Sequence, residues 1–427
     1  MRVVGGLSWV VGLGAAAIAI ALTSPGDVAP AEPGEAAVPR DLAAYSHLTG
    51  SVTSSAPGAA VALFQHGWGV ELFDFPQAVV LGAGGDAYRR VDAAEDRASA
   101  ASQGDPAPML LSPDGTKVAV GDHETADPDV VVVDLLTGEA TSHSLPTGQS
   151  VLPVAWSRDG TTLAHLLSPE PTNPYTGERI AGEVGVLDLG DDSTDLLPGD
   201  DVTAVAFSPG GTELAVERAG TSFTDARISV VDLAGGGTRD LGTVGALAGP
   251  AAWSPDGQLL ATTTLEPSGA PAGAPDPGMP TGLAFVDPSA PSSGADVPDP
   301  MELPLAEAGR VLGWTDAGEV VALLEVAGDD PCCAEAYDLS RVPLDGAAPQ
   351  PLMRISDLGS YGVGRFQLAS ATVGDLQVVT PGEVDRGPWP PPWLRGGLAL
   401  LVGLLVWLVS RWVLRLTSPD PVTDPPR

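Results

Sequence analysis

Basic residues are scarce in this chain. Only 20 of its 427 residues are lysine or arginine, against 55 aspartates and glutamates, so the formal net charge is −35. Lys117 is the single lysine. A surface that binds nucleic acid needs clustered lysine and arginine to neutralise phosphates. We therefore expect no nucleic-acid partner, and the excess of acidic residues is typical of a highly soluble surface.

Cysteine is scarce too. The two cysteines, Cys332 and Cys333, are adjacent, so the chain cannot build a framework of disulfides. They form either a strained vicinal disulfide or a pair of thiols in a loop, and we regard them as a redox-sensitive candidate. Asp329 and Asp330 lie close by, but a zinc site wants four suitable ligands. We predict no metal and no cofactor.

Motifs for catalysis are also missing. The sequence holds no Gly-x-Ser-x-Gly nucleophile elbow, no phosphate-binding glycine loop, and no cluster of histidine and cysteine with metal-ligand spacing. Glycoside hydrolysis needs a pair of carboxylates, but with 55 acidic residues in the chain no particular pair can be identified as catalytic. These absences lead us to predict no catalytic residue.

Two long apolar runs are present, one near each end. Residues 3–22 are typical of a secretory signal, and they are also long enough to be an uncleaved anchor. The second run has tryptophans before it and near its far end, as expected for the two headgroup belts of a bilayer. We therefore predict a signal peptide or anchor over 1–31, a linker over 32–40, a Pro-rich linker over 381–393, a transmembrane helix over 394–416 and a cytoplasmic tail over 417–427.

A five-residue turn recurs five times between the two runs. It is Trp-Ser-Pro-Asp-Gly in its clearest form, and its closing glycines recur every 45 to 61 residues. Such a period indicates one supersecondary unit used repeatedly. Proline presets the first turn position, aspartate bonds its own downstream backbone, and glycine takes the positive φ that closes the hairpin. The residues that we assign to these structural turns are Asp114, Gly115, Trp156, Asp159, Gly160, Trp253, Asp256, Gly257 and Trp314.

Each turn lies in a unit of four short strands. The second strand is followed by a loop, by a strand that ends in Asp-Leu, and by a final short strand, as at 130–145. This repeat predicts an all-β fold, a six- or seven-bladed β-propeller over residues 41–380. Residues 55–63 give a sixth hairpin, and 366–379 are half of a seventh that 42–48 would complete. We favour seven blades over six.

These repeats resemble those of TolB-like and WD40-like (PD40-type) propellers, whose blades carry a Trp-Ser-Pro-Asp-Gly turn and a third strand that ends in aspartate. The match covers roughly residues 50–380 and departs from the pattern at Gly210 and Ala317. The Gly-His and Trp-Asp dipeptides of strict WD40 blades are missing, so the TolB-like type is the better comparison. The resemblance implies a platform that binds proteins, and fold alone does not fix function.

The irregular loops are expected on one face of the disc. Turns between the first and second strands are short, whereas loops between the second and third strands are long and varied. Loops on a rigid scaffold usually carry binding. The residues that we select on this long-loop face are Asp122, His123, Glu124, Asp127, Asp129, Tyr175, Arg179, Asp329 and Asp330.

The sequence therefore predicts a propeller outside the cytoplasm, tethered to the cell membrane by one span, or by two if the signal is uncleaved. We expect it to be a protein-binding or assembly module with a partner in the cell envelope. The alternative is an extracytoplasmic enzyme, directed at glycan or peptide, with its site in the propeller channel. If the last blade ends on its second strand near Thr380, the chain leaves on the long-loop face, which would then look toward the membrane.

Overall fold

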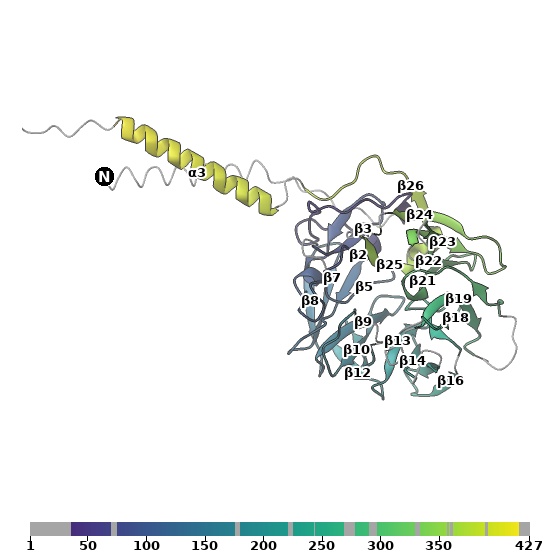
Figure 1. Ribbon diagram of the computed structural model, residues 1–427. Helices are drawn as coiled ribbons and strands as arrows, with labels where there is room; N and C mark the ends of the chain where they lie inside the picture. Colours follow the sequence, from purple (N-terminus) through teal and green to yellow (C-terminus); the bar gives the residue numbers. More distant parts are fainter. Residues whose placement is uncertain are drawn as a thin grey trace, which may run out of the picture. The chain divides into compact units, whose positions relative to one another are not determined.

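The fold is a six-bladed β-propeller. The computed structural model describes residues 36–69, 75–175, 180–220, 225–242, 244–268, 278–289, 297–328, 334–356, 358, 362–388 and 392–417. Six four-stranded sheets are arranged around a central axis, and the labelled strands β5, β9, β13, β21 and β25 face the centre (Figure 1). The propeller lies within one compact unit, Pro30–Arg386, and the C-terminal helix belongs to a separate unit.

Five of the blades are continuous in sequence, and each is an antiparallel meander. From the innermost to the outermost strand, the first two of these blades are β5 (Met109–Leu111), β6 (Lys117–Val120), β7 (Asp129–Asp134) and β8 (Ala140–Ser144), and then β9 (Ser150–Trp156), β10 (Thr162–Ser168), β11 (Glu183–Asp188) and β12 (Ser193–Leu196). The next two are β13 (Val202–Phe207), β14 (Glu213–Arg218), β15 (Arg227–Asp232) and β16 (Thr238–Gly242), and then β17 (Ala246–Leu247), β18 (Leu260–Glu266), β19 (Met279–Val286) and β20 (Met301–Glu302). The last of the five is β21 (Val311–Trp314), β22 (Val320–Ala327), β23 (Ala334–Val342) and β24 (Gln350–Ser356).

The remaining blade joins the two ends of the ring. Its innermost strand, β25 (Val363–Leu368), pairs antiparallel with β2 (Ala60–His66), which is followed outward by β3 (Gln77–Gly82) and β4 (Tyr88–Arg90). The preference for seven blades was therefore wrong. The segment interpreted as half of a seventh blade supplies the inner strand of the first one, and residues 42–48 contain no strand. This closure leaves no open edge on the ring.

Alternation within the strands builds the core between the blades. In β7, Val130 and Val132 pack in a cluster with Trp156 of the next blade, whereas Val133 packs in a cluster with Leu63 of the previous blade. Because successive side chains point to opposite faces of a sheet, an unbroken run of valine serves both neighbours at once. The Val-rich third strands are thus explained by burial on both faces.

The tryptophans that end the inner strands join adjacent blades. Nε1–H of Trp156 donates to the carbonyl oxygen of Leu110 in the preceding blade at 3.2 Å. The same contact recurs from Trp253 to Ala206 at 3.1 Å and from Trp314 to Ala251 at 2.9 Å. Each indole therefore fills the gap between two sheets and also pairs a buried carbonyl group, which would be costly to leave alone.

The turn after each tryptophan is closed by its own side chains. Ser254 Oγ donates to Asp256 Oδ1 at 2.6 Å and accepts from the Leu259 amide at 2.9 Å. This contact with Ser254 lowers the pKa of Asp256. Gly257 has φ +72°, a conformation in which other residues are strained. The Ser–Asp contact recurs at Ser112–Asp114 and Ser157–Asp159.

The chain leaves the last strand at the short-turn face. After β25, a 3₁₀ helix, η2 (Ser370–Asp375), leads into β26 (Gln377–Val379), which pairs in parallel with β1 (Ala37–Pro39). Val379 lies against Gly85 in the turn between β3 and β4, on the same face as the short turns. The premise that Thr380 leaves on the long-loop face was therefore wrong, because β26, which was expected to be the second strand of a blade, pairs with β1 and not with β25.

Both flanking segments are fixed to the first blade. β1 lies where we expected a linker, and Asp385 follows the edge of β4, with the Tyr88 amide donating to its carbonyl oxygen at 2.7 Å. Arg89, whose side chain is 5% exposed, forms an ion pair with Asp385 at 2.8 Å. Arg386 Nη2 donates to the Ala44 carbonyl oxygen at 2.6 Å. The part of the chain bound to the propeller thus extends to Arg386.

Helical structure is sparse in the described residues. A short helix, α2 (Asp92–Glu95), and a 3₁₀ helix, η1 (Glu307–Gly309), lie in connections between blades. The longest helix is α3 (Pro392–Thr417), in which the 18 residues Gly396–Val413 have a mean hydropathy of 1.8. This one helix is long and apolar enough to cross a membrane. The predicted signal peptide or anchor, residues 1–31, lies outside the described residues.

Candidate functional site

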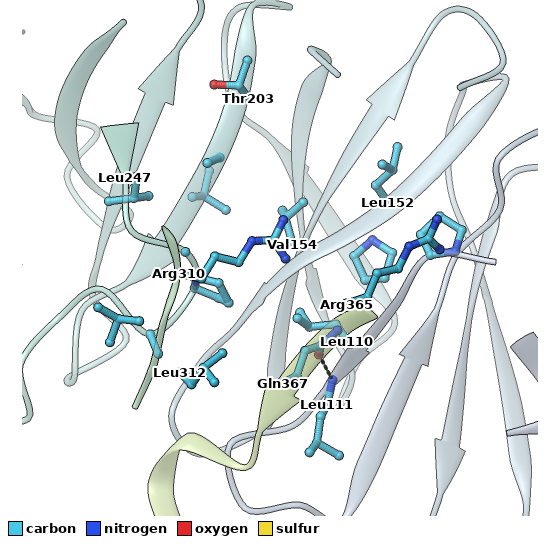
Figure 2. A pocket seen from close by; sticks show the side chains of 18 of the residues that line it. Leu110, Leu111, Leu152, Val154, Thr203, Leu247, Arg310, Leu312, Arg365 and Gln367 are labelled. Carbon is cyan, nitrogen blue, oxygen red and sulfur yellow. Dashed lines mark hydrogen bonds between the residues drawn. The ribbon is translucent and has the colours of Figure 1, made fainter. Parts of the chain in front are cut away.

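A cavity of about 500 Å³ occupies the centre of the propeller. All six innermost strands line it, with apolar side chains such as Leu110, Leu152 and Leu312 making up much of its wall (Figure 2). Its volume lies within the range of small-molecule sites. His123, Pro174 and Ile180 from the long loops also line it, as do Pro113 and Ser370 at the short-turn end, so the cavity extends along the channel and reaches the long-loop face.

Gln367 connects β25, the innermost strand of the blade that closes the ring, to β5, the innermost strand of the next blade. Its Nε2 donates to the Met109 carbonyl oxygen and its Oε1 accepts from the Leu111 amide, both at 2.9 Å (Figure 2). These two contacts replace a backbone ladder between β25 and β5. The side chain therefore joins the closing strand to the next blade of the ring.

A buried carboxylate holds one arginine at the long-loop mouth. Asp105, which is 0% exposed, accepts from the Gly69 amide at 2.7 Å, from the Tyr175 hydroxyl and from Arg365 Nη2 at 3.3 Å. Burial lowers the pKa of Arg365, and Asp105 opposes this. Burial and then Asp105 raise the pKa of Tyr175. Tyr175, selected from the sequence, thus fixes Asp105 and acts on the cavity through it.

Backbone conformation at the mouth is strained in two places. Arg365 has φ +54° and Glu307 has φ +50°, and neither is a glycine. The two are linked, because Glu307 Oε2 accepts from the Phe366 amide at 2.7 Å. Burial raises the pKa of Glu307, and this amide opposes the shift. Strain of this kind costs about 1–3 kcal/mol per residue and clusters at functional sites.

Arg310 is the second arginine at the mouth. It lies just before β21, and its side chain points into the cavity (Figure 2). Gly249, with φ +86°, makes room for it, because an added Cβ atom would lie 3.3 Å from Cβ and Cγ of Arg310. Within the described parts of the chain, no hydrogen bond or ion pair is formed by Arg310.

Glu217 is a buried carboxylate on the cavity wall, 2% exposed. Its Oε1 accepts from Thr203 Oγ1 at 2.9 Å, and its Oε2 accepts from the Leu247 amide at 2.5 Å. Both oxygens are therefore bound by donors from two neighbouring inner strands. This arrangement positions β13 against β17 and satisfies the charge of the carboxylate.

His123, which was selected from the sequence, lies on the cavity wall. It is 3% exposed, and its Nδ1 lies 2.9 Å from Thr172 Oγ1. Its Nε2 has no hydrogen-bond partner among the residues that the structure describes. Burial, followed by the positive charge of Arg365, lowers the pKa of His123 to about 3. The ring is therefore neutral at physiological pH.

Four more selected residues, which lie in the described part of the chain, do not line the cavity. Glu124 and Asp127 are exposed, and Asp122 accepts from the Glu124 amide at 3.0 Å. Burial raises the pKa of Asp122. Asp129 lies in β7 and binds Arg97 at 2.8 Å, so it has a structural partner. Arg179, Asp329, Asp330, Cys332 and Cys333 lie outside the described residues.

Sequence reasoning missed Arg310, although a signal for it existed. Arg310, Leu152 and Thr203 each lie four residues before the aromatic residue that ends an inner strand, and all three line the cavity. Counting back from Trp314 would therefore have placed Arg310 at the channel. Arg365 carries no such signal, since its strand lacks both the aromatic end and the turn.

Comparison with known proteins finds similar solved structures at low sequence identity. No protein-family model matches the chain, and no curated protein matches it in sequence. TolB from Acinetobacter baumannii is 17% identical with a TM-score of 0.46, over 73% of this chain and 67% of that one. A putative TolB from Agrobacterium tumefaciens is 12% identical with a TM-score of 0.43, over 74% of this chain and 96% of that one. An oligogalacturonate lyase in complex with manganese is 13% identical with a TM-score of 0.41, over 73% and 77%.

Proposed function

We propose that this protein is a membrane-tethered binding module, whose propeller takes up a partner in the cell envelope at the long-loop mouth of its channel. The observation that carries the proposal is the convergence of Arg310, Arg365 and His123 on one cavity that reaches the long loops. Loops supported by a rigid scaffold are a common place for binding.

The tether is supported by the apolar helix α3. After Arg386, which is bound to the propeller, only residues 387–391 precede the helix. Five residues span at most about 18 Å. If α3 crosses a bilayer, the propeller therefore stays close to the membrane surface. An epitope tag in the exposed turn at Gly346 should be accessible from outside intact cells, and a tag accessible only after permeabilisation would contradict the external placement.

The partner-binding role is tested by charge reversal on opposite faces of one blade. Glu124 and Glu139 are both exposed, with Glu124 in the long loop and Glu139 in the short turn. We expect Glu124→Arg in the full-length protein to reduce recovery of a crosslinked partner from membranes. Glu139→Arg is the matched control and should leave recovery unchanged. Equal recovery from both variants would contradict binding at the long-loop face.

An extracytoplasmic enzyme directed at glycan or peptide is the second candidate. The presence of His123, Arg365 and Glu217 around one cavity favours it. Its test is release of reducing sugar or new amino termini from envelope glycan or peptide by the purified protein. Turnover that is lost in His123→Gln would favour the enzyme over the binding module.

A further inference from the structure

We propose that the central cavity binds a small amphiphilic carboxylate, with its apolar body between the inner strands and its carboxylate on Arg310. This inference goes beyond the protein-binding role, because its ligand is a small molecule and its test needs no protein partner, although the two proposals share Arg310 at the mouth of the channel. It assigns a chemical class of ligand to the central cavity, which the sequence alone did not do.

The first argument is the state of the two arginines. Arg365 is already bound, since Asp105 and the Pro106 carbonyl oxygen both accept from it at 3.3 Å. Arg310 binds neither a carboxylate nor a carbonyl group within the described residues, and Gly249 leaves space for its aliphatic stem. A guanidinium group is suited to a carboxylate, which it can bind through two parallel N–H donors.

The second argument is that no carboxylate of the mouth forms an ion pair with Arg310 within the described residues, although the charge of Arg310 acts to lower the pKa of Glu307 against the larger effect of burial. Glu217 accepts from Thr203 and from the Leu247 amide, and Glu307 accepts from the Phe366 amide. Asp105 is held by three donors. Each of these side chains is therefore fixed by donors other than Arg310, which leaves the guanidinium group available to a ligand.

The third argument comes from the rest of the wall. Leu152, Val154 and Leu312 supply apolar surface to the cavity that Arg310 enters, which favours a ligand with an apolar body (Figure 2). His123 lines the same cavity with a buried Nε2 that has no partner in the described chain. Because that nitrogen is buried, the ring adds neutral surface to the wall and makes no polar contact with the ligand in this arrangement.

The net charge of the protein does not prevent such binding. At physiological ionic strength, exposed charges more than about 8 Å away are largely screened. The acidic outer surface therefore contributes little inside the cavity, where Arg310 is in direct contact with a ligand. Apolar burial provides affinity, and Arg310 provides selection for a negative group.

The experiment compares two ligands of the same shape. Binding of naphthaleneacetate and naphthaleneacetamide to the full-length protein in lipid nanodiscs is titrated by saturation-transfer NMR, with empty nanodiscs as the blank. We expect the carboxylate to bind about ten- to hundredfold more tightly than the amide, which is the usual effect of a hydrogen bond to a charged group. Equal affinity for the two ligands would overturn the proposal.

Two variants test the assignment to Arg310. In Arg310→Gln the preference for the carboxylate should disappear. The matched control is Arg158→Gln, which removes the same charge from an exposed arginine at the short-turn end of the channel and should keep the preference. A preference that survives in Arg310→Gln would overturn the assignment. None of these outcomes depends on capture of a partner, so this proposal and the protein-binding role fail separately.

A last arm separates two sources of the carboxylate. A leucyl-phenylalanine dipeptide with a free carboxyl end is compared with its amidated form. Preference for naphthaleneacetate over its amide supports the small-molecule source. Preference limited to the free dipeptide would assign the site to the chain end of a protein and would overturn the small-molecule source.

Discussion

Replacing His165 with methionine should change how the stability of the propeller depends on pH. His165 lies in β10, is 0% exposed, and neither of its ring nitrogens has a hydrogen-bond partner in the described chain. The ring lies over Gly185, where an added Cβ atom would be 2.3 Å from Nε2. Burial lowers the pKa of His165 to about 4, from a usual value of 6.5, and the nearby backbone of Leu163 opposes this shift. Methionine is flexible and apolar, so it fills the same space without a titrating group.

Whether stability rises or falls with pH depends on which state, folded or unfolded, is protonated first as the pH falls. As pH falls below 6.5, the ring is protonated in the unfolded chain but not in the folded one. The contribution of His165 to stability is therefore fully present above pH 6.5 and is lost as pH falls toward about 4. Each pH unit costs about 1.4 kcal/mol, which gives about 3 kcal/mol over this interval.

The assay is urea unfolding of full-length wild-type and His165→Met proteins in nanodiscs, followed by tryptophan fluorescence between pH 4 and 7. Other titrating groups, such as His123 and Glu95, are common to both proteins and cancel in the difference. The unfolding free energy of the variant should gain about 3 kcal/mol on that of the wild type as pH falls from 6.5 to 4. A difference in unfolding free energy that stays constant between pH 6.5 and 4 would refute the reasoning. It would mean that His165 has the same pKa in the folded and in the unfolded protein.

Two further predictions concern contacts between blades and at the mouth. Trp253→Phe keeps a ring between the blades but removes the donor to the Ala206 carbonyl oxygen, so urea unfolding should show a loss of about 1–3 kcal/mol; an unchanged midpoint would mean that water replaces the indole. Asp105→Asn removes the carboxylate charge that is paired with the buried Arg365 and should cost about 3–5 kcal/mol. The double variant with Arg365→Met should recover part of this loss, and strictly additive effects in this cycle would contradict a coupled pair.

The propeller could be predicted from the sequence because each copy of the repeated motif lies within a short segment of the chain. Each turn from Trp156 to Gly160 and its counterparts joins strands that are neighbours in the chain, so spacing alone identifies the repeat. The number of blades depends on a non-local pair, in which Ala62 faces Leu368 about 300 residues later. The closing strand ends in Leu368 and lacks the turn motif, because no hairpin follows it.

Prediction of the site was limited for a similar reason. His123 and Tyr175 were selected because they lie in long loops, and the structure brings both to the mouth of the cavity, Tyr175 through Asp105. Asp105 and Arg365 are about 260 residues apart and become partners only when the ring closes. No local pattern marks either residue. Arg310 was within reach of sequence reasoning, had the register of the inner strands been counted from Trp314.

Because the ring closes through β25, the first blade cannot be completed until the last blade strand has been synthesised. β2, whose seven residues are all buried in the finished ring, is the first blade strand to be made, and its partner on the inner side follows about 300 residues later. At about 5–20 residues per second, synthesis leaves that apolar edge unpaired for roughly 15–60 s. Unpaired edges of this kind recruit other chains. The earliest strand is thus the last to be protected, and the newborn chain must be shielded until its final blade strand arrives.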